Sequence, residues 1–134
     1  MGKISGPLLD RIDIHIDIPA IKYKELAEIK DAEPSAMIKE RVEKARALQL
    51  ERFKENGVFF NAQMNTKLIK KHCVLNVEAK ELLKLAMHEL GLSARAYDKI
   101  LKVSRTVADL AESESILAEH ISEAIQYRSL DRQF

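Results

Sequence analysis

The amino-acid sequence predicts a mainly helical fold, in which an N-terminal strand and linker precede a bundle of four or five helices. The chain has 134 residues, about one domain, and 46% of them are apolar, which suffices for one modest core. It holds only four glycines and three prolines, too few for the frequent turns of a β-sandwich. From Lys22 onward the apolar residues recur with helical spacing.

Alternating isoleucines predict one strand near the N-terminus. Four isoleucines from Ile12 to Ile18 are separated by polar residues, so a period of two places all four on one face. Pro19 ends the run because it cannot donate a ladder hydrogen bond. One strand cannot form a sheet, so its partners must lie outside this chain or be absent. We therefore expect residues 12–18 to be mobile, to fold back on the bundle or to pair with a second copy.

Capping residues and helix breakers divide the rest of the chain. Pro34 suits a first helical turn, and Asn76 and Ser93 are good N-caps. Gly57 and Gly91 supply stops. The sequence therefore predicts helices over 23–29, 35–56, 66–72, 77–90, 94–111 and 117–128.

Helical spacing also predicts which side chains face inward. The last three helices should bury one cluster, made of Leu82, Leu83, Ala86, Leu101, Val107, Ile121 and Ile125. The inward stripe of helix 35–56 contains Ile38, Val42, Ala45, Leu48 and Phe53. That of helix 94–111 contains Tyr97, Ile100, Leu101, Ser104, Val107, Ala108 and Ala111.

The overall charge and the single cysteine limit the classes of function. Twenty-two basic and 21 acidic residues give a net charge of +1, so no global field attracts nucleic acid or an anionic membrane. One cysteine excludes an intramolecular disulfide framework and fits a reducing compartment. No apolar run reaches the length of a membrane span, and no signal peptide opens the chain. We therefore expect a cytoplasmic protein without a membrane partner.

Known catalytic and metal-binding motifs are absent from the sequence. It contains no phosphate loop of the form GxxxxGK[ST], no GxGxxG, no HExxH and no CxxC. Asp10, Asp13, His15 and Asp17 resemble metal ligands, but on a strand Asp13 and Asp17 would lie about 13 Å apart. We interpret them as a solvated strand face, and no metal site is predicted.

The histidines and the cysteine also predict no metal site. The pair His72-Cys73 lacks the further ligands of a zinc site, and His88 and His120 stand alone on helices. The interpretation that fits Cys73 is a partly buried loop cysteine.

Arg95 is unusual on physical grounds. It follows the cap Ser93 in the first turn of a helix, where a cation opposes the helix dipole at a cost of about 0.3–1 kcal/mol. Arg95, Lys99 and Lys102 share the face opposite the apolar stripe. Free N–H groups at a helix N-terminus attract anions, so this face is either a phosphate site or a solvated surface.

Arg11 is the second unusual arginine. It follows a Gly-Pro turn and lies at the start of the predicted strand. From the residues alone it is either a functional arginine or the ion-pair partner of Asp10 or Asp13.

Four motifs follow one another along nearly the whole chain. They are SGPLLDRIDIH (5–15), RVEKARALQLER (41–52), LSARAYDK (92–99) with SRTVADL (104–110), and EAIQYR within residues 120–128. Together they resemble the magnesium-chelatase-like AAA+ ATPases of the ComM/YifB competence-protein group.

The resemblance implies that the chain is the C-terminal part of a larger ATPase. Residues 1–33 would be the last core strand and linker, and residues 34–134 the helical lid domain. The intact protein would bind ATP and Mg²⁺ as a homo-oligomeric ring and act on DNA. Its N-terminal ATPase core, with the phosphate loop and the Mg-holding acid, would be the missing partner. The fragment alone would bind no cofactor and would not be an enzyme.

The resemblance also implies roles for individual residues. Arg11 matches the arginine finger, which reaches a neighbouring subunit's ATP. Arg95 matches the sensor-2 arginine, which touches the γ-phosphate bound by its own subunit's core, and Ser93 and Lys99 would join it in nucleotide binding. Lys99 stands where the family often has Arg, which keeps the charge but not the bidentate fork. The alternatives are a helical module that binds DNA or protein without nucleotide, and a magnesium chelatase subunit.

Overall fold

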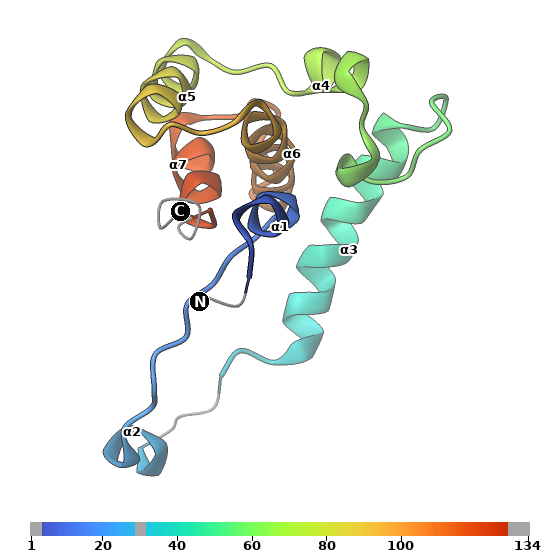
Figure 1. Cartoon of the computed structure of the whole chain (residues 1–134). Coiled ribbons are helices and arrows are strands. Elements are labelled where there is room, and N and C mark those ends of the chain that lie inside the picture. Colours follow the sequence, from blue (N-terminus) through green and yellow to red (C-terminus); the bar gives the residue numbers. More distant parts are fainter. Residues whose placement is uncertain (1–3, 29–31, 129–134) are drawn as a thin grey trace.

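Helices supply the regular structure of the chain in its computed structural model, which describes residues 4–28 and 32–128 (Figure 1). In order they are α1 (Gly6–Arg11), α2 (Tyr23–Ala27), α3 (Ser35–Arg52), the 3-10 helix η1 (Asn61–Gln63), α4 (Thr66–His72), α5 (Val77–Leu90), α6 (Ala94–Leu110) and α7 (Ala118–Gln126). Within these ranges there is no strand, only one isolated bridge between Leu75 and Ile116. The mainly helical class is confirmed.

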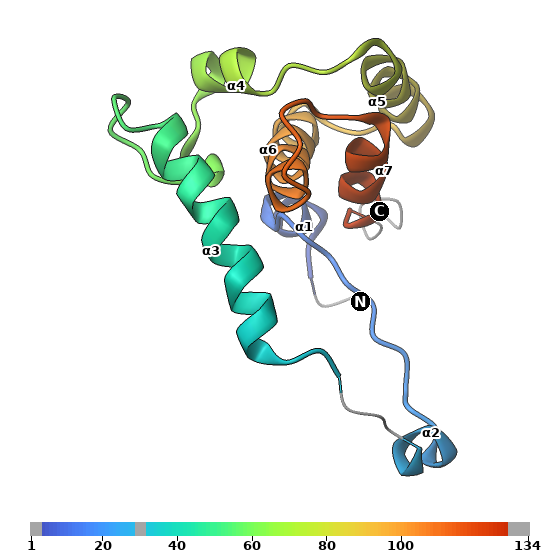
Figure 2. The ribbon, with the colours of Figure 1, turned by 180° about the vertical axis from the view of Figure 1, so that it is seen from behind.

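Helix α6 lies at the centre of the helical body. It contacts α1, α3, α4, η1 and α7, while α5 packs against α7. Figures 1 and 2 show α3 running along one side of α6, with its N-terminal half and α2 extending away from the body. None of the helices in the described part of the chain is both long and apolar enough to cross a membrane.

The core lies between α4, α5, α6 and α7. Four members of the predicted cluster are buried there and two lie partly buried against it: Leu83, Leu101, Ile121 and Ile125, then Leu82 and Ala86. Val107 is only half-buried. Most of the predicted α6 stripe is also buried, but Tyr97 and Ala111 are exposed. The predicted inward faces of the helices are therefore correct at the centre of the body and wrong at its edge.

Capping residues place the helix ends close to where the sequence predicts them. Asn76 accepts a hydrogen bond from the Ala79 N–H at 2.8 Å and so begins α5. Gly91 ends α5 in the left-handed region, with φ of 58°. Helix α3 ends at Arg52 rather than at residue 56. The predicted end of the first helix, at residue 29, lies outside the described residues.

The predicted strand over residues 12–18 is wrong. A short helix, α1, precedes it where a turn was expected, because Ser5 Oγ accepts the Leu8 N–H and Pro7 occupies the first turn. The segment that follows is extended but pairs with no strand, since the described residues contain none.

The isoleucines of this segment consequently stay in solvent. Ile16 and Ile18 are 68% and 80% exposed. Only the start of the segment folds back on the bundle, where the His15 N–H donates to the Tyr127 carbonyl. Folding back was one of the three expected outcomes.

The predicted inward stripe of α3 is buried over only part of its length. Ala45 and Phe53 are buried, but Ile38, Val42 and Leu48 are each more than 40% exposed. Figure 1 shows the N-terminal half of α3 extending beyond α6, which agrees with the exposure of Ile38 and Val42 there.

Truncation of Leu101 tests the packing of α6. Leu101 belongs to the buried cluster, so Leu101→Ala should lower the free energy of unfolding by about 2–5 kcal/mol. Leu110→Ala, at a 43% exposed position on the same helix, is the control and should change it much less. Urea denaturation measures both. An unmoved midpoint for Leu101→Ala would contradict the packing described here.

Candidate functional site

The N-terminus of α6 carries three of the predicted site residues. Ser93 caps the helix, since its Oγ accepts the Ala96 N–H at 3.1 Å. Arg95 is exposed in the first turn. Lys99 lies one turn further along, with its side chain 21% exposed.

Helix α1 docks on this end of α6 and brings the neighbours of Arg11 to it. Ser93 Oγ donates to Asp10 Oδ1 at 3.0 Å, and Lys99 forms an ion pair with Asp13. A cavity of about 240 Å³ lies between the two elements, lined by Gly6, Pro7, Leu9, Asp10, Gly91, Leu92 and Ser93. Two motifs more than 80 residues apart thus meet in one place.

Arg11 and Arg95 differ from the other arginines of the described ranges. Both are exposed, and neither has a hydrogen bond, ion pair or ring contact there. The other five described arginines are held: Arg41 by Glu33, Arg46 over the Phe60 ring, Arg52 and Arg105 by Asp109, and Arg128 by Asp10 and Ile12. The pairing of Arg11 with Asp10 or Asp13, left open by the sequence, does not occur.

Sequence reasoning missed two buried residues beside α1. The Arg128 side chain is 1% exposed, and it bonds to Asp10 and Ile12, which lie 116 or more positions away, beyond the reach of any spacing rule. His15 was predicted on a solvated face but is 5% exposed. Its Nε2 lies 3.0 Å from the Leu9 carbonyl and 3.1 Å from the Ile12 carbonyl. Both partners are acceptors, so this nitrogen carries the ring proton.

The acidic residues near the N-terminus do not form a metal site. Asp10 and Asp13 are bonded to Ser93 and Lys99, and His15 points its Nε2 at backbone carbonyls. In the described ranges no group of three or more His, Cys, Asp or Glu side chains could hold a metal ion.

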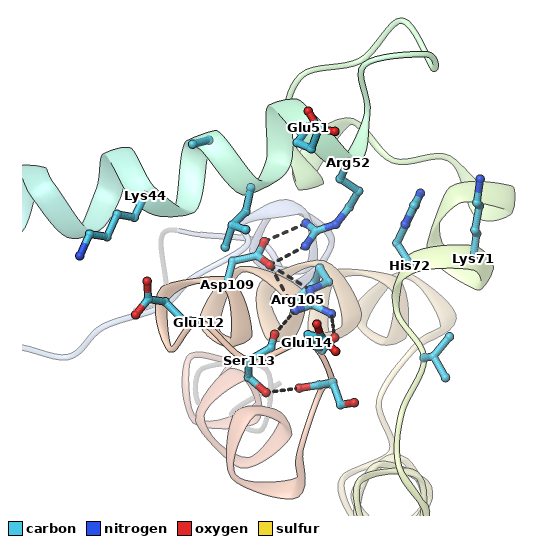
Figure 3. A pocket seen from close by; sticks show the side chains of 14 residues that line it. Lys44, Glu51, Arg52, Lys71, His72, Arg105, Asp109, Glu112, Ser113 and Glu114 are labelled. Carbon is cyan, nitrogen blue, oxygen red and sulfur yellow. Dashed lines mark hydrogen bonds and ion pairs between the residues drawn. The ribbon is translucent and has the colours of Figure 1, made fainter.

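A second, larger pocket of about 860 Å³ lies between α3, α4 and the C-terminal end of α6 (Figure 3). Asp109 is its central charged group and is fully buried. The carboxylate receives two hydrogen bonds from Arg52, at 2.6 and 2.9 Å, and one from Arg105 Nε at 3.2 Å. Asn61 Nδ2 donates a further bond at 2.9 Å. Every face of the carboxylate is thus satisfied by groups from α3, η1 and α6.

Arg105 extends this cluster to the loop after α6. Its two terminal nitrogens donate to the carbonyls of Ser113 and Glu114, at 2.7 and 2.8 Å. Burial lowers the pKa of Arg105, and Asp109 opposes that effect. The cluster occupies one wall of the pocket with groups that already have partners.

His72 lines the same pocket at the end of α4, and Cys73 follows it in the chain. The His72 ring packs edge-on against Phe53 at 5.4 Å, and its buried Nε2 has no partner within the described chain. Burial lowers the pKa of His72, and the nearby Arg52 lowers it further. Cys73 is more buried than predicted, and burial raises the pKa of its thiol to about 11.

Comparison with known proteins places this fold in a family. The chain belongs to the family described as "Magnesium chelatase, subunit ChlI C-terminal", which it matches over residues 32–128. Among individual proteins, it is 41% identical over 133 residues to the competence protein ComM of Haemophilus influenzae, covering 98% of this chain and 25% of ComM. It is 38% identical over 133 residues to the uncharacterized protein YifB of Escherichia coli, covering 98% of this chain and 26% of YifB.

A more distant relative is covered by the chain to a similar extent. An uncharacterized protein of Mycobacterium tuberculosis is 29% identical over 128 residues, covering 96% of this chain and 25% of that protein. The chain therefore spans about a quarter of the length of these curated relatives. It corresponds to the C-terminal region of ComM/YifB-type, magnesium-chelatase-like proteins, which confirms the resemblance stated above.

Asp109→Asn tests the buried cluster. The change keeps the shape of the side chain but leaves Arg52 and Arg105 without a carboxylate, and breaking a buried ion pair costs about 3–5 kcal/mol. We expect a loss of that size in urea denaturation. Glu112→Gln removes an exposed carboxylate from the same pocket and is the matched control. A loss below about 1 kcal/mol for Asp109→Asn, similar to an exposed pair, would contradict the cluster.

The lowered pKa of His72 predicts how stability depends on pH. In the folded state this pKa lies below its ordinary value of 6.5, so below pH 6.5 the unfolded state binds more protons. The contribution of neutral His72 is therefore present above pH 6.5 and is lost as the pH falls. Urea midpoints between pH 7.5 and 5 should decrease less steeply for His72→Leu than for the wild type. His88→Gln, at an exposed position, should retain the wild-type slope. Equal slopes for His72→Leu and wild type would contradict a lowered pKa of His72 in the folded state.

Proposed function

We propose that this chain is the helical lid part of a larger AAA+ ATPase and that it supplies two arginines to ATP hydrolysis in a ring of identical subunits. One observation carries the proposal. Arg11 and Arg95 alone among the described arginines are exposed and without a partner, and both lie where α1 meets α6. Guanidinium groups left without a partner in the chain are available to a ligand outside it.

The position of Arg95 suits contact with a phosphate. It stands in the first turn of a 17-residue helix, where free N–H groups and the helix dipole favour an anion. In the proposal Arg95 meets the γ-phosphate held by the core of its own subunit. Its guanidinium would offset the charge that the terminal phosphate oxygens carry during transfer.

Arg11 would act on the neighbouring subunit. It lies at the end of α1, and its side chain points into solvent rather than toward the acids beside it. ATP bound elsewhere in the intact protein would supply the phosphoryl group, and the phosphate loop and Mg²⁺-holding acid would come from the rest of that protein. Ser93 and Lys99 would complete the nucleotide site only if Asp10 and Asp13 were displaced from them.

In the proposal the whole protein is longer than this chain, because the chain spans about a quarter of the length of its curated relatives, and its further properties are inferred from them. In the proposal residues 1–33 connect the ATPase core to the lid, and residues 34–134 form the lid. A relative named as a competence protein supports DNA as the substrate of the intact motor, because competence is the uptake of DNA. The chelatase alternative is supported only by the name of the family.

Substitution of the two arginines in the full-length protein tests the proposal. Arg11→Ala should leave ATP binding intact and reduce turnover by about 10³–10⁵-fold, the range known for arginine fingers. Arg95→Ala should weaken both ATP binding and turnover, because its side chain would meet the bound phosphate. Arg41→Ala, which breaks an exposed ion pair with Glu33, is the control and should change neither.

Mixing experiments separate the two roles. Subunits with Arg11→Ala, mixed with subunits mutated in the phosphate loop, should regain part of the activity, because intact fingers then face intact pockets. Arg95→Ala mixed in the same way should regain little. Turnover of Arg11→Ala close to that of the wild type would refute the role in the neighbouring subunit.

A further inference from the structure

The side chain of Arg128 holds the backbone on both sides of Arg11. It enters from the C-terminal end of α7 and is 1% exposed. Arg128 Nη1 donates to the Ile12 carbonyl at 2.8 Å, and Nη2 donates to the Asp10 carbonyl at 3.2 Å. Carbonyls in the last turn of a helix lack partners within it, so this guanidinium satisfies acceptors that α1 itself leaves open.

Three further contacts hold this helix and the residues that directly follow it. Ser93 donates to Asp10, and Lys99 pairs with Asp13, both from α6. On the α7 side, the His15 N–H donates to the Tyr127 carbonyl, next to Arg128 in the chain. Helix α1 is therefore bonded to α6 on one side and to the end of α7 on the other.

These contacts decide where Arg11 points. A helix of six residues is not stable alone, so the direction of α1 depends on what it docks against. Within the described ranges Arg11 has no side-chain bond, so its side chain is aimed only through the backbone at Asp10 and Ile12. Those are the residues whose carbonyls Arg128 holds.

We infer that Arg128 is a positioning residue that fixes α1, and with it Arg11, on the end of α6 that carries Arg95. The catalytic part of the inference rests on the proposed function. Arg128 acts through Arg11 and does not itself contact the nucleotide. Because misplacement of a catalytic group by about 1 Å costs on the order of 10²-fold in rate, its loss should resemble a milder loss of Arg11.

Amide hydrogen exchange in the chain itself tests the structural part. Arg128→Gln should speed exchange at the His15 amide by at least about tenfold, because opening of α1 then needs no separation from the guanidinium. The Ala124 amide, inside α7, should exchange as in the wild type. Arg41→Gln is the matched control, because it makes the same substitution at an exposed arginine. Unchanged exchange at His15 in Arg128→Gln would overturn the inference.

A milder variant covers the case in which Arg128→Gln does not fold. Arg128→Lys keeps the charge but replaces the fork with a single donor group, which cannot hold both carbonyls in the same way. It should fold and should still speed exchange at His15, by a smaller factor. Wild-type exchange in Arg128→Lys would overturn the need for the fork.

Steady-state kinetics of the full-length protein test the catalytic part. Arg128→Gln should lower kcat by about 10²-fold with the KM for ATP unchanged. Mixing it with subunits mutated in the phosphate loop should restore part of the activity, as for Arg11→Ala. A raised KM without restoration would assign Arg128 a merely structural role and overturn the inference.

The same experiment separates the inference from the proposed function. If Arg11→Ala loses turnover while Arg128→Gln keeps it, the inference fails and the proposed function stands. If Arg11→Ala keeps wild-type turnover, the proposed function fails, and the catalytic part of the inference fails with it.

Discussion

The attachment of α3 to the helical body depends on one buried carboxylate. Apolar packing alone offers little here, since Ala45 is the one buried apolar residue of α3, and Ile38 and Val42 are each 44% exposed. Asp109 of α6 supplies a strong polar link, because Arg52 at the end of α3 donates to both of its oxygens. Burying these charges is costly, and only the full set of donors from α3, η1 and α6 compensates for it. The cluster thus fixes where α3 ends and where the following loop begins.

The same helix that carries Asp109 also carries the candidate site at its other end. Helix α6 has 17 residues, which corresponds to about 25 Å at 1.5 Å per residue. Its buried Ile100, Leu101 and Ala108 hold it in the core between those ends. A rigid, centrally packed helix therefore sets the position of Arg95 relative to the rest of the helical body, and α1 takes its position from the same helix end.

Local rules predicted the parts of this structure that local interactions determine. Asn76, Ser93 and Gly91 placed the ends of α5 and α6 correctly because a cap acts within four residues of itself. The isoleucine alternation was misleading, because a period of two makes a strand only where another strand is available. Arg105 and Asp109 lie four positions apart and resemble an exposed helical pair, yet both are buried.

In the candidate site, too, some features were predictable from the sequence and others were not. Arg95 and Arg11 were singled out from their places in the sequence, and the family resemblance assigned their roles. The docking of α1 was not predictable, because it joins residues 83 to 118 positions apart through single hydrogen bonds. No periodicity or composition encodes such contacts, and only the folded chain brings them together.

The number of residues in α3 sets the rotation between its two ends as well as the distance between them. An α-helix turns by about 100° with each residue, so a helix of 18 residues joins its two ends with a defined rotation as well as a separation of about 27 Å. Arg52 fixes one end of α3 to Asp109, and the other end leads toward residues 4–28. Adding or removing a single residue within α3 would rotate whatever precedes it to a different side of the helical body. Among close relatives, changes in this helix should therefore come in whole turns or be absorbed in the linker before Ser35.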